Sequence, residues 1–226
     1  MSPRLSIIMP VLDEAAGIEA ALGLLAPYRA RGIEVIVVDG GSSDNTIELS
    51  RALADQVLTA PRGRSLQMNA GAAGARGEVF LFLHADTRLP DHADVHVLDG
   101  LGRSGRVWGR FDGRFDRGLA LVARMMNARS RLTAIATGDQ AIFVTRAAFA
   151  RVGGFPPIAL MEDLALSARL KRIGRPLALR ACVTTSGRRW RQNGTLRTVL
   201  LMWRLRLRYF LGADPAKLAR QYGYRY

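Results

Sequence analysis

Carboxylates that directly follow apolar runs are the most informative feature of this chain of 226 residues. Asp39 closes the run 34–38, and Asp86 follows the run 79–83. A short unbroken apolar run is typical of a buried parallel strand, and open α/β sheets bind ligands beyond the carboxyl ends of such strands. The two carboxylates therefore predict one shared site for a nucleotide, with a metal ion as a further candidate ligand.

Polar residues after the first three apolar runs predict the nucleotide contacts. The segment Pro10 to Glu14 puts Asp13 where a carboxylate can bond a ribose or a base, or can cap a helix. Two glycines after Asp39 let the backbone approach a ligand closely, so Asp39 can accept from a nucleobase N–H. Arg64, near the start of a helix, suits a phosphate, although a solvated loop arginine is the alternative.

Two histidine patterns are candidates for metal binding. His84 and Asp86 are two residues apart and should share one side of an extended segment. Asp86 is the better ligand for Mg²⁺, and Mn²⁺ tolerates the imidazole of His84 more readily. His92 and His96 have helical spacing and could form half a zinc site, but without an obvious third ligand a solvated helix face is favoured.

Two charged segments in the second half contain further candidates for functional residues. Glu162 and Asp163 open a helix, where acids either complement the dipole or serve as a general base. Arg188 and Arg189 precede Trp190 in a basic segment, for which a basic surface with a core tryptophan is one interpretation.

Alternating strand and helix signals describe the scaffold for these residues. The expected strands of the first half are 5–9, 34–38, 56–59 and 78–83, with helices at 14–31, 46–53 and 65–75. This order implies parallel strands with right-handed crossovers. The second half predicts a two-faced antiparallel strand at 106–115, a helix at 118–135, a strand at 140–145, and helices at 162–173, 195–211 and 215–222. The fold class is thus α/β with a mixed sheet flanked by helices.

Charge is segregated along the chain. The net charge is −5 over residues 1–100, +10 over 101–186 and +9 over 187–226. Such asymmetry suggests a polyanionic partner or an anionic membrane surface. A nucleic-acid-binding protein is an alternative, but the basic half lacks interleaved aromatics and a reader motif, so we expect no nucleic acid. The helix 196–211 could lie on a membrane, although packing of its apolar stripe on the sheet is favoured.

The expected location is cytoplasmic, with peripheral contact at the inner face of the membrane as an option. One cysteine fits a reducing compartment. Neither a signal peptide nor a run of about 18 apolar residues is apparent.

The ordered motifs resemble family 2 glycosyltransferases of the GT-A fold over residues 4–190. They are Pro10-x-x-Asp13-Glu14, Val37-Val38-Asp39-Gly40-Gly41-Ser42-Ser43-Asp44, Arg64-x-x-x-x-Asn69-x-Gly71, Ala85-Asp86, Gly153-Gly154-Phe155 and Glu162-Asp163-Leu164-x-x-x-x-Arg169-Leu170. Segment 186–190 is similar to the Arg-Trp motif of polysaccharide synthases. The His-Ala-Asp form and the short length also resemble a small standalone bacterial subgroup labelled as radical-SAM-associated or arsenosugar biosynthesis transferases.

The resemblance implies an inverting enzyme that moves a sugar from a UDP- or GDP-sugar to an unknown acceptor hydroxyl. It also implies Mg²⁺ or Mn²⁺ beneath the diphosphate. The family usually has Asp-x-Asp where this chain has His84-Ala85-Asp86. The implied site residues are Pro10, Asp13, Glu14, Asp39, Arg64, Asn69 and Ala85 for the nucleotide, His84 and Asp86 for the metal, Asp163 as base beside Glu162, and Asp139, Gln140, Arg188, Arg189 and Trp190 for the diphosphate and acceptor.

A single GT-A domain is expected to span residues 1–226. Its parts are a nucleotide-binding half (1–100), an acceptor and catalytic half (101–190) and a basic amphipathic helical segment (191–226). A nucleotidyltransferase is the remaining alternative, but it usually has a glycine-rich loop with Lys or Arg after the first strand. This chain has Pro-Val-Leu-Asp-Glu there.

Overall fold

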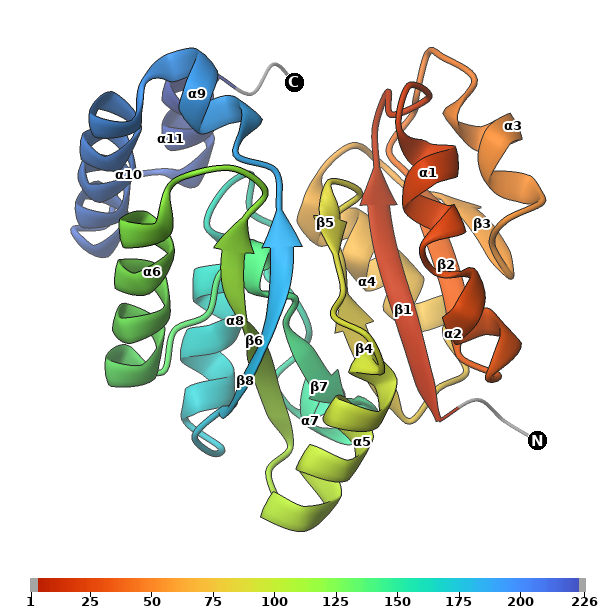
Figure 1. Cartoon of the computed structure of the whole chain (residues 1–226). Coiled ribbons are helices and arrows are strands. Elements are labelled where there is room, and N and C mark those ends of the chain that lie inside the picture. The colour runs from red at the N-terminus through yellow and green to blue at the C-terminus, as the bar shows by residue number, and fades with distance from the viewer. Residues whose placement is uncertain (1–3, 224–226) are drawn as a thin grey trace.

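Apolar runs of the first half form one half of a sheet in the computed structural model, which describes residues 4–223 except the side chain of Arg189 (Figure 1). In chain order the elements are β1 (Leu5–Val11), α1 (Ile18–Gly23), α2 (Ala26–Ala30), β2 (Glu34–Asp39), α3 (Thr46–Arg51), β3 (Gln56–Thr59), α4 (Arg64–Gly74), β4 (Val79–Phe82), β5 (Thr87–Arg88), α5 (Ala93–Ser104), β6 (Trp108–Phe115), α6 (Ala120–Thr133), the 3₁₀ turn η1 (Gly138–Gln140), β7 (Phe143–Thr145), α7 (Arg146–Arg151), α8 (Glu162–Lys171), β8 (Leu177–Thr185), α9 (Arg188–Asn193), α10 (Thr195–Phe210) and α11 (Pro215–Tyr222).

The strands form one sheet in the order β3-β2-β1-β4-β7-β6-β8-β5. The pairs β3-β2, β2-β1 and β1-β4 are parallel, because helices cross over between successive strands. β7 is antiparallel to β4 and β6, whereas β8 is parallel to β6 and antiparallel to β5. The prediction of a mixed α/β sheet, parallel in its first half, is confirmed.

Each face of the sheet packs against its own set of helices, because successive strand residues point to opposite faces. Ile7 and Val35 belong to a buried cluster with residues of α1, α2 and α5. Ile8 and Ile36 belong to a second cluster with residues of α4, α7 and α8. A third, smaller cluster joins α8 to α10 and α11. The C-terminal helices are therefore attached to the sheet through α8, whose first turn carries Glu162 and Asp163.

Several expected elements differ from those in the structure. The helix predicted at 14–31 is divided into α1 and α2, since Pro27 lies in the first turn of α2 and lacks an N–H for a continuous helix. The strand predicted at 140–145 begins at Phe143, because a capping box between Thr137 and Gln140 forms η1 first. β6 pairs antiparallel with β7 as predicted, but its longer pairing with β8 is parallel.

Six elements were not predicted: β5, α5, η1, α7, β8 and α9. β8 is the longest strand, yet its sequence interrupts apolar residues with Arg180 and neither alternates nor forms an apolar run. Its pairing with β6 defines it. In α5, Gly100 and Gly102 weaken the helical signal. Gly100 lies so close to β8 that an added Cβ would be 2.7 Å from Leu177.

The expected packing of the apolar stripe of α10 on the sheet is wrong. The helix instead turns Thr198 and Leu205 inward, and Leu205 packs in the cluster with α8 and α11. The stripe itself is exposed on the surface. Its members and their exposed fractions are Leu196 (72%), Leu200 (56%), Trp203 (57%), Leu207 (61%), Phe210 (69%) and Leu211 (76%).

Candidate functional site

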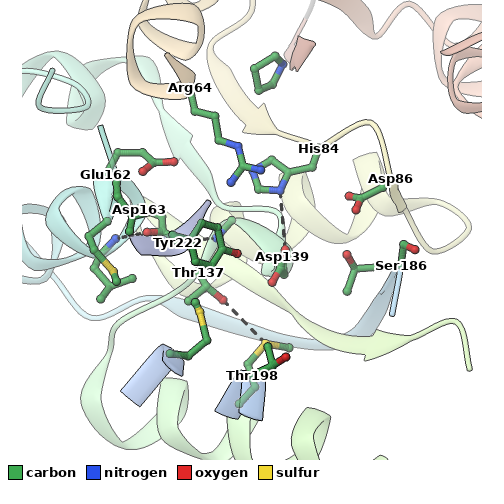
Figure 2. A pocket seen from close by; sticks show the side chains of 18 of the residues that line it. Arg64, His84, Asp86, Thr137, Asp139, Glu162, Asp163, Ser186, Thr198 and Tyr222 are labelled. Atoms are coloured by element: carbon green, nitrogen blue, oxygen red, sulfur yellow. Dashed lines mark hydrogen bonds and ion pairs between the residues drawn. The ribbon is translucent and has the colours of Figure 1, made fainter. Parts of the chain in front are cut away.

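A cavity of about 760 Å³ lies at the carboxyl ends of β1 and β4. The first turn of α8 and residues of α6 and α10 complete its lining. Figure 2 shows Arg64 and His84 on one side of it and Thr198 on the other, with Asp86 and Ser186 apart from Glu162 and Asp163. Eleven of the sixteen predicted site residues line this cavity, namely Pro10, Glu14, Arg64, His84, Ala85, Asp86, Asp139, Glu162, Asp163, Arg188 and Trp190.

Asp39 does not line the cavity but organises the loop after β2. Its buried carboxylate accepts from the backbone N–H groups of Gly41 at 2.7 Å and Ser42 at 2.9 Å, and from the Ser42 hydroxyl. The Ser42 oxygen in turn accepts from the N–H of Asp13 at 2.9 Å, and the N–H of Ser43 donates to Asp13 at 2.7 Å. The two predicted nucleotide carboxylates thus connect the loops after β1 and β2.

Asn69 and Gln140 also hold the backbone in place. The amide of Asn69 donates to the carbonyl of Phe155 at 2.8 Å and accepts from the N–H of Phe155 at 3.0 Å. These two hydrogen bonds fix the loop before α8, where Gly154 has a φ of +63° and lies against Asn69. Gln140 is fully buried and closes the capping box of η1 with Thr137.

Glu14 and Asp86 place two carboxylates near each other at the strand-end side of the cavity. Burial raises the pKa of Glu14, and the charge of Asp86 raises it further, whereas Arg188 and Arg64 act in the opposite direction. Asp86 is also tied to the segment after β8, because the N–H of Ser186 donates to its carbonyl at 3.2 Å. The two carboxylates are candidate ligands for a hard divalent cation, which prefers oxygen ligands.

His84 and Asp86 do not share one side of an extended strand. The N–H of Thr87 donates to the carbonyl of His84 at 3.0 Å, and the tight turn that results separates the two side chains (Figure 2). His84 instead faces Asp139, with 3.8 Å between Nδ1 and Oδ1. It also packs on Gly138, where an added Cβ would lie 2.4 Å from the imidazole.

Asp163 is held in a defined orientation at the start of α8. Its Oδ2 accepts from the N–H of Gly138 at 2.8 Å, and its Oδ1 accepts from the N–H of Leu164 at 2.8 Å. Glu162, at 6% exposure, has its pKa raised to about 7, first by burial and then by the charge of Asp163. The charge of Asp163 thus acts directly on its neighbour Glu162, and both carboxyl groups line the cavity.

Arg188 and Trp190 enter the cavity from α9. Trp190 packs edge-to-face on Phe115, with ring centroids 5.6 Å apart. The N–H of Gly187 donates to Asp116 at 2.9 Å, which fixes the start of α9. The side chain of Arg189 lies outside the described residues.

Sequence reasoning missed the helical wall of the cavity. Arg129 on α6 and Arg206 on α10 line it, as do apolar side chains of the same helices. The available signal was the position of Arg206 at the apolar edge of the helix, which departs from the arginine stripe. No local sequence pattern indicated that Arg129 would line the cavity. His92 and His96 are exposed, and the described residues contain no group of three or more His, Cys, Asp or Glu that could hold a metal ion.

Residues 6–151 match the family described as Glycosyl transferase family 2, so the chain belongs to that family. A relative in Bacillus subtilis (strain 168), named probable glycosyltransferase YdaM, is 26% identical over 93% of this chain. The chain spans 55% of that protein, about half its length. The family assignment agrees with the resemblance drawn from the ordered motifs.

Solved structures of glycosyltransferases share the fold, which is GT-A. S. aureus TarS superposes with a TM-score of 0.68 and 18% identity, covering 81% of this chain and 36% of that chain. A mannosyltransferase, PcManGT from Pyrobaculum calidifontis, in complex with GDP-Man and Mn²⁺, gives a TM-score of 0.64 and 22% identity over 81% of this chain and 57% of that chain. No helix within residues 4–223 is both long and apolar enough to cross a membrane.

Proposed function

We propose that this protein transfers a sugar from a nucleotide-diphosphate sugar to an acceptor hydroxyl, with inversion at the anomeric carbon and Asp163 as general base. The observation that carries the proposal is the orientation of Asp163 by two backbone N–H groups inside a cavity shared with the ends of β1 and β4. Family membership supports the reaction class, and the GDP-Man complex of PcManGT illustrates the donor class in a protein of this fold. Membership of the radical-SAM-associated subgroup stays a prediction.

In the proposed reaction, a residue of the cavity takes the proton of the acceptor and the diphosphate is the leaving group. The acceptor hydroxyl gives its proton to Asp163, and its oxygen forms a bond to the anomeric carbon from the face opposite the diphosphate. The bond between that carbon and the diphosphate oxygen breaks, and the electron pair leaves with the diphosphate. Glu162, whose pKa is raised to about 7 by burial and by the charge of Asp163, carries only part of a negative charge near neutral pH.

The donor is proposed to lie along the strand-end side of the cavity. Pro10, Glu14 and Ala85 would line the nucleoside, and Arg64 and Arg188 would neutralise the diphosphate. The predicted nucleotide contacts of Asp13, Asp39 and Asn69 stay predictions; the bonds described above give each of them a role in positioning loops. Arg189, Trp190, Asp139 and Gln140 stay candidates for the diphosphate and acceptor side.

The donor set fits a divalent cation that is completed by substrate phosphates. Asp86 with Glu14 offers two carboxylates, which suits Mg²⁺ because Mg²⁺ is commonly held by one or two carboxylates, waters and phosphate oxygens. We propose that Asp86 holds Mg²⁺ or Mn²⁺ there, with Glu14 beside it. A bound cation would supply neutralisation of the charge that develops on the leaving diphosphate. His84 faces Asp139 and is the weaker candidate ligand.

A thermal-shift panel tests this proposal. UDP, GDP, CDP, dTDP and ADP would each be added with and without Mn²⁺, since a ligand of the native state raises the melting temperature by mass action. A metal-dependent shift with one nucleoside diphosphate is expected. Incubation with the matching nucleotide sugar should then release nucleoside diphosphate. Release of pyrophosphate would instead support the nucleotidyltransferase alternative.

A peripheral contact with an anionic membrane is part of the proposal for this protein's partners. The exposed stripe of α10 supports it, together with Leu121, Met125 and Leu132, which are exposed on α6. Arg124 on α6 and Arg204 on α10 are exposed on the same helices. Apolar side chains beside arginines suit a surface of anionic lipid, because the chains enter the interface while the guanidinium groups meet the headgroups.

A further inference from the structure

Two arginines of the cavity have buried guanidinium nitrogens that donate no hydrogen bond to any of the described residues. They are Arg129 on α6, through Nε and Nη2, and Arg206 on α10, through Nε. Buried N–H donors are almost always satisfied, because leaving one unmade costs the full desolvation of the group. Since both side chains line the cavity, the missing acceptor atoms are expected to come from a ligand in that cavity.

The charges around these arginines reinforce this expectation. Burial and, after it, the charge of Arg206 lower the pKa of Arg129 to about 10, whereas Asp163 acts in the opposite direction. Arg129 therefore stays cationic at neutral pH, beside a second cation. The hydrogen bonds that Asp163 accepts come from the N–H groups of Gly138 and Leu164. Two cations in one buried place favour an anion between them.

Different charges act on the proposed cation site and on this arginine pair. The charges that act on Glu14 come from Asp86, Arg188, Arg64 and Asp44. The charges that act on Arg129 come from Arg206, Asp163 and Arg110. Asp163 is among the charges that act on Arg129, so a ligand held by this pair would lie near the proposed base, where an acceptor must lie if Asp163 takes its proton.

Apolar side chains surround the pair. Val122 and Met126 of α6 and Met202 and Trp203 of α10 line the same cavity. The hydroxyl of Thr137 lies 3.8 Å from the sulfur of Met126, so that wall is a mixed one with one polar group. A ligand at this place would meet two guanidinium groups and a hydrocarbon surface together.

We propose that Arg129 and Arg206 form an oxyanion subsite that binds a phosphate or carboxylate group of the acceptor and so aims its hydroxyl at Asp163. The proposal rests on the glycosyl transfer proposed above. It specifies an anionic acceptor with an apolar portion next to the anion. Guanidinium groups suit this role because their planar fork matches the oxygens of phosphate and carboxylate.

The test is calorimetric titration of the full chain with inorganic phosphate, while UDP or GDP and Mn²⁺ saturate the proposed donor site on the strand-end side of the cavity. The variants are Arg206→Met and the double variant R129Q/R206Q. The matched controls are Arg124→Gln and Arg204→Gln, which are exposed on the same two helices and do not line the cavity. Phosphate affinity should fall about tenfold or more in the first two and stay unchanged in the controls.

Melting temperatures without ligand separate a binding role from a structural one. Removal of a repelling, unsatisfied cation should raise the melting temperature of Arg206→Met by about 2–4 °C, because binding groups are held at a cost to stability. A fall in melting temperature would show that the arginines stabilise the fold and would overturn the proposal. Equal phosphate affinity in R129Q/R206Q and wild type would overturn it as well.

Nucleotide affinity in the same variants tells the two proposals apart. Loss of phosphate binding with unchanged nucleotide binding supports the subsite. If wild type binds no nucleoside diphosphate, the proposal of glycosyl transfer is contradicted. The phosphate titration then still tests the oxyanion subsite. Titration with glycerol 3-phosphate and octyl phosphate identifies the source of the anion. Tighter binding of octyl phosphate indicates a lipid-like acceptor, and equal binding of the two indicates a soluble one. In either case the R129Q/R206Q variant should lose affinity for both compounds.

Discussion

The strand-end side and the helical side of the cavity differ in how their polar groups are satisfied. On the strand-end side, Asp13, Asp39 and Ser42 bond one another and the backbone of two loops. On the helical side, Arg129 and Arg206 keep buried donors without partners, and α10 leaves its apolar stripe exposed. The sign of the charge differs too, from −5 over residues 1–100 to +9 over residues 187–226.

This difference indicates which groups have their partners within the protein and which would gain partners from a ligand or a surface. A loop held by its own hydrogen bonds offers a ligand a fixed backbone at little cost in entropy. Unsatisfied cations and exposed apolar side chains instead gain their partners from a ligand or a surface. We therefore expect changes on the strand-end side to affect folding and donor binding, and changes on the helical side to affect acceptor and membrane binding.

The largest expected effect is the loss of turnover on substitution of Asp163, the proposed general base. Asp163→Asn should lower the turnover number by about 10²–10⁴-fold, the range of a lost general base, and leave nucleoside diphosphate binding unchanged. The measurement is steady-state transfer together with calorimetry. Asp91→Asn is the control, because Asp91 is exposed and does not line the cavity. Near-normal turnover of Asp163→Asn would refute the assignment.

Next in size is the change at the cation site. Asp86→Ala should weaken Mn²⁺-dependent nucleotide binding about tenfold or more, which is about 1.4 kcal/mol. Binding without metal should change little, since only the cation contact is lost. Calorimetric titration with and without Mn²⁺ measures both. An unchanged affinity in Mn²⁺ would place the cation, if there is one, elsewhere.

Glu162 predicts a pH dependence of stability. Its pKa of about 7 in the folded protein lies above the ordinary value of 4.5, so its contribution is complete below about pH 4.5 and is lost as the pH rises through about 7. The upper limit of this contribution is about 3 kcal/mol. Urea unfolding between pH 5 and pH 8 should show stability falling with pH.

Glu162→Gln should remove most of that slope. Glu14, whose pKa is also raised, accounts for the slope that remains, and Glu14→Gln serves as the comparison. A slope that is equally steep in Glu162→Gln and in wild type would show that the carboxyl group titrates normally.

Gly71→Ala sharpens the comparison by testing packing on the strand-end side. An added Cβ would lie 2.4 Å from Ile8 and 2.9 Å from Val38, so α4 must move from the sheet. We expect a loss of about 1–3 kcal/mol in the free energy of unfolding. Gly102→Ala is the matched control in α5, where no atom lies within 4 Å, and should gain about 0.4–1 kcal/mol.

The smallest expected effect on stability comes from the exposed stripe. L196S/L200S/L207S should stay within about 0.5 kcal/mol of wild type, because these side chains are exposed. Sedimentation with vesicles that contain phosphatidylglycerol should fall, however, while neutral vesicles bind little either way. Leu24→Ser, an exposed leucine between α1 and α2, is the control. Equal sedimentation of wild type and the triple variant would exclude this face as the membrane contact.

Much of the strand-end side could be predicted from the sequence because its signals are local. The apolar runs 34–38 and 79–83 became β2 and β4, and the acids that open α8 stand at its N-terminus as expected. Most of the predicted site residues meet in one cavity for this reason. β8 was missed because its pairing with β6 joins segments far apart in the chain.

The sequence by itself determined the parallel first half of the sheet, the family motifs and the position of Asp163 at a helix start. Each depends on periodicity or on a capping position within a few residues. The tertiary structure alone decided which side chains face which partner. It buried Asp39 in its own loop, turned His84 toward Asp139, and brought Arg129 and Arg206 together from two helices. Contacts between distant segments depend on packing of the whole chain, and no local pattern records them.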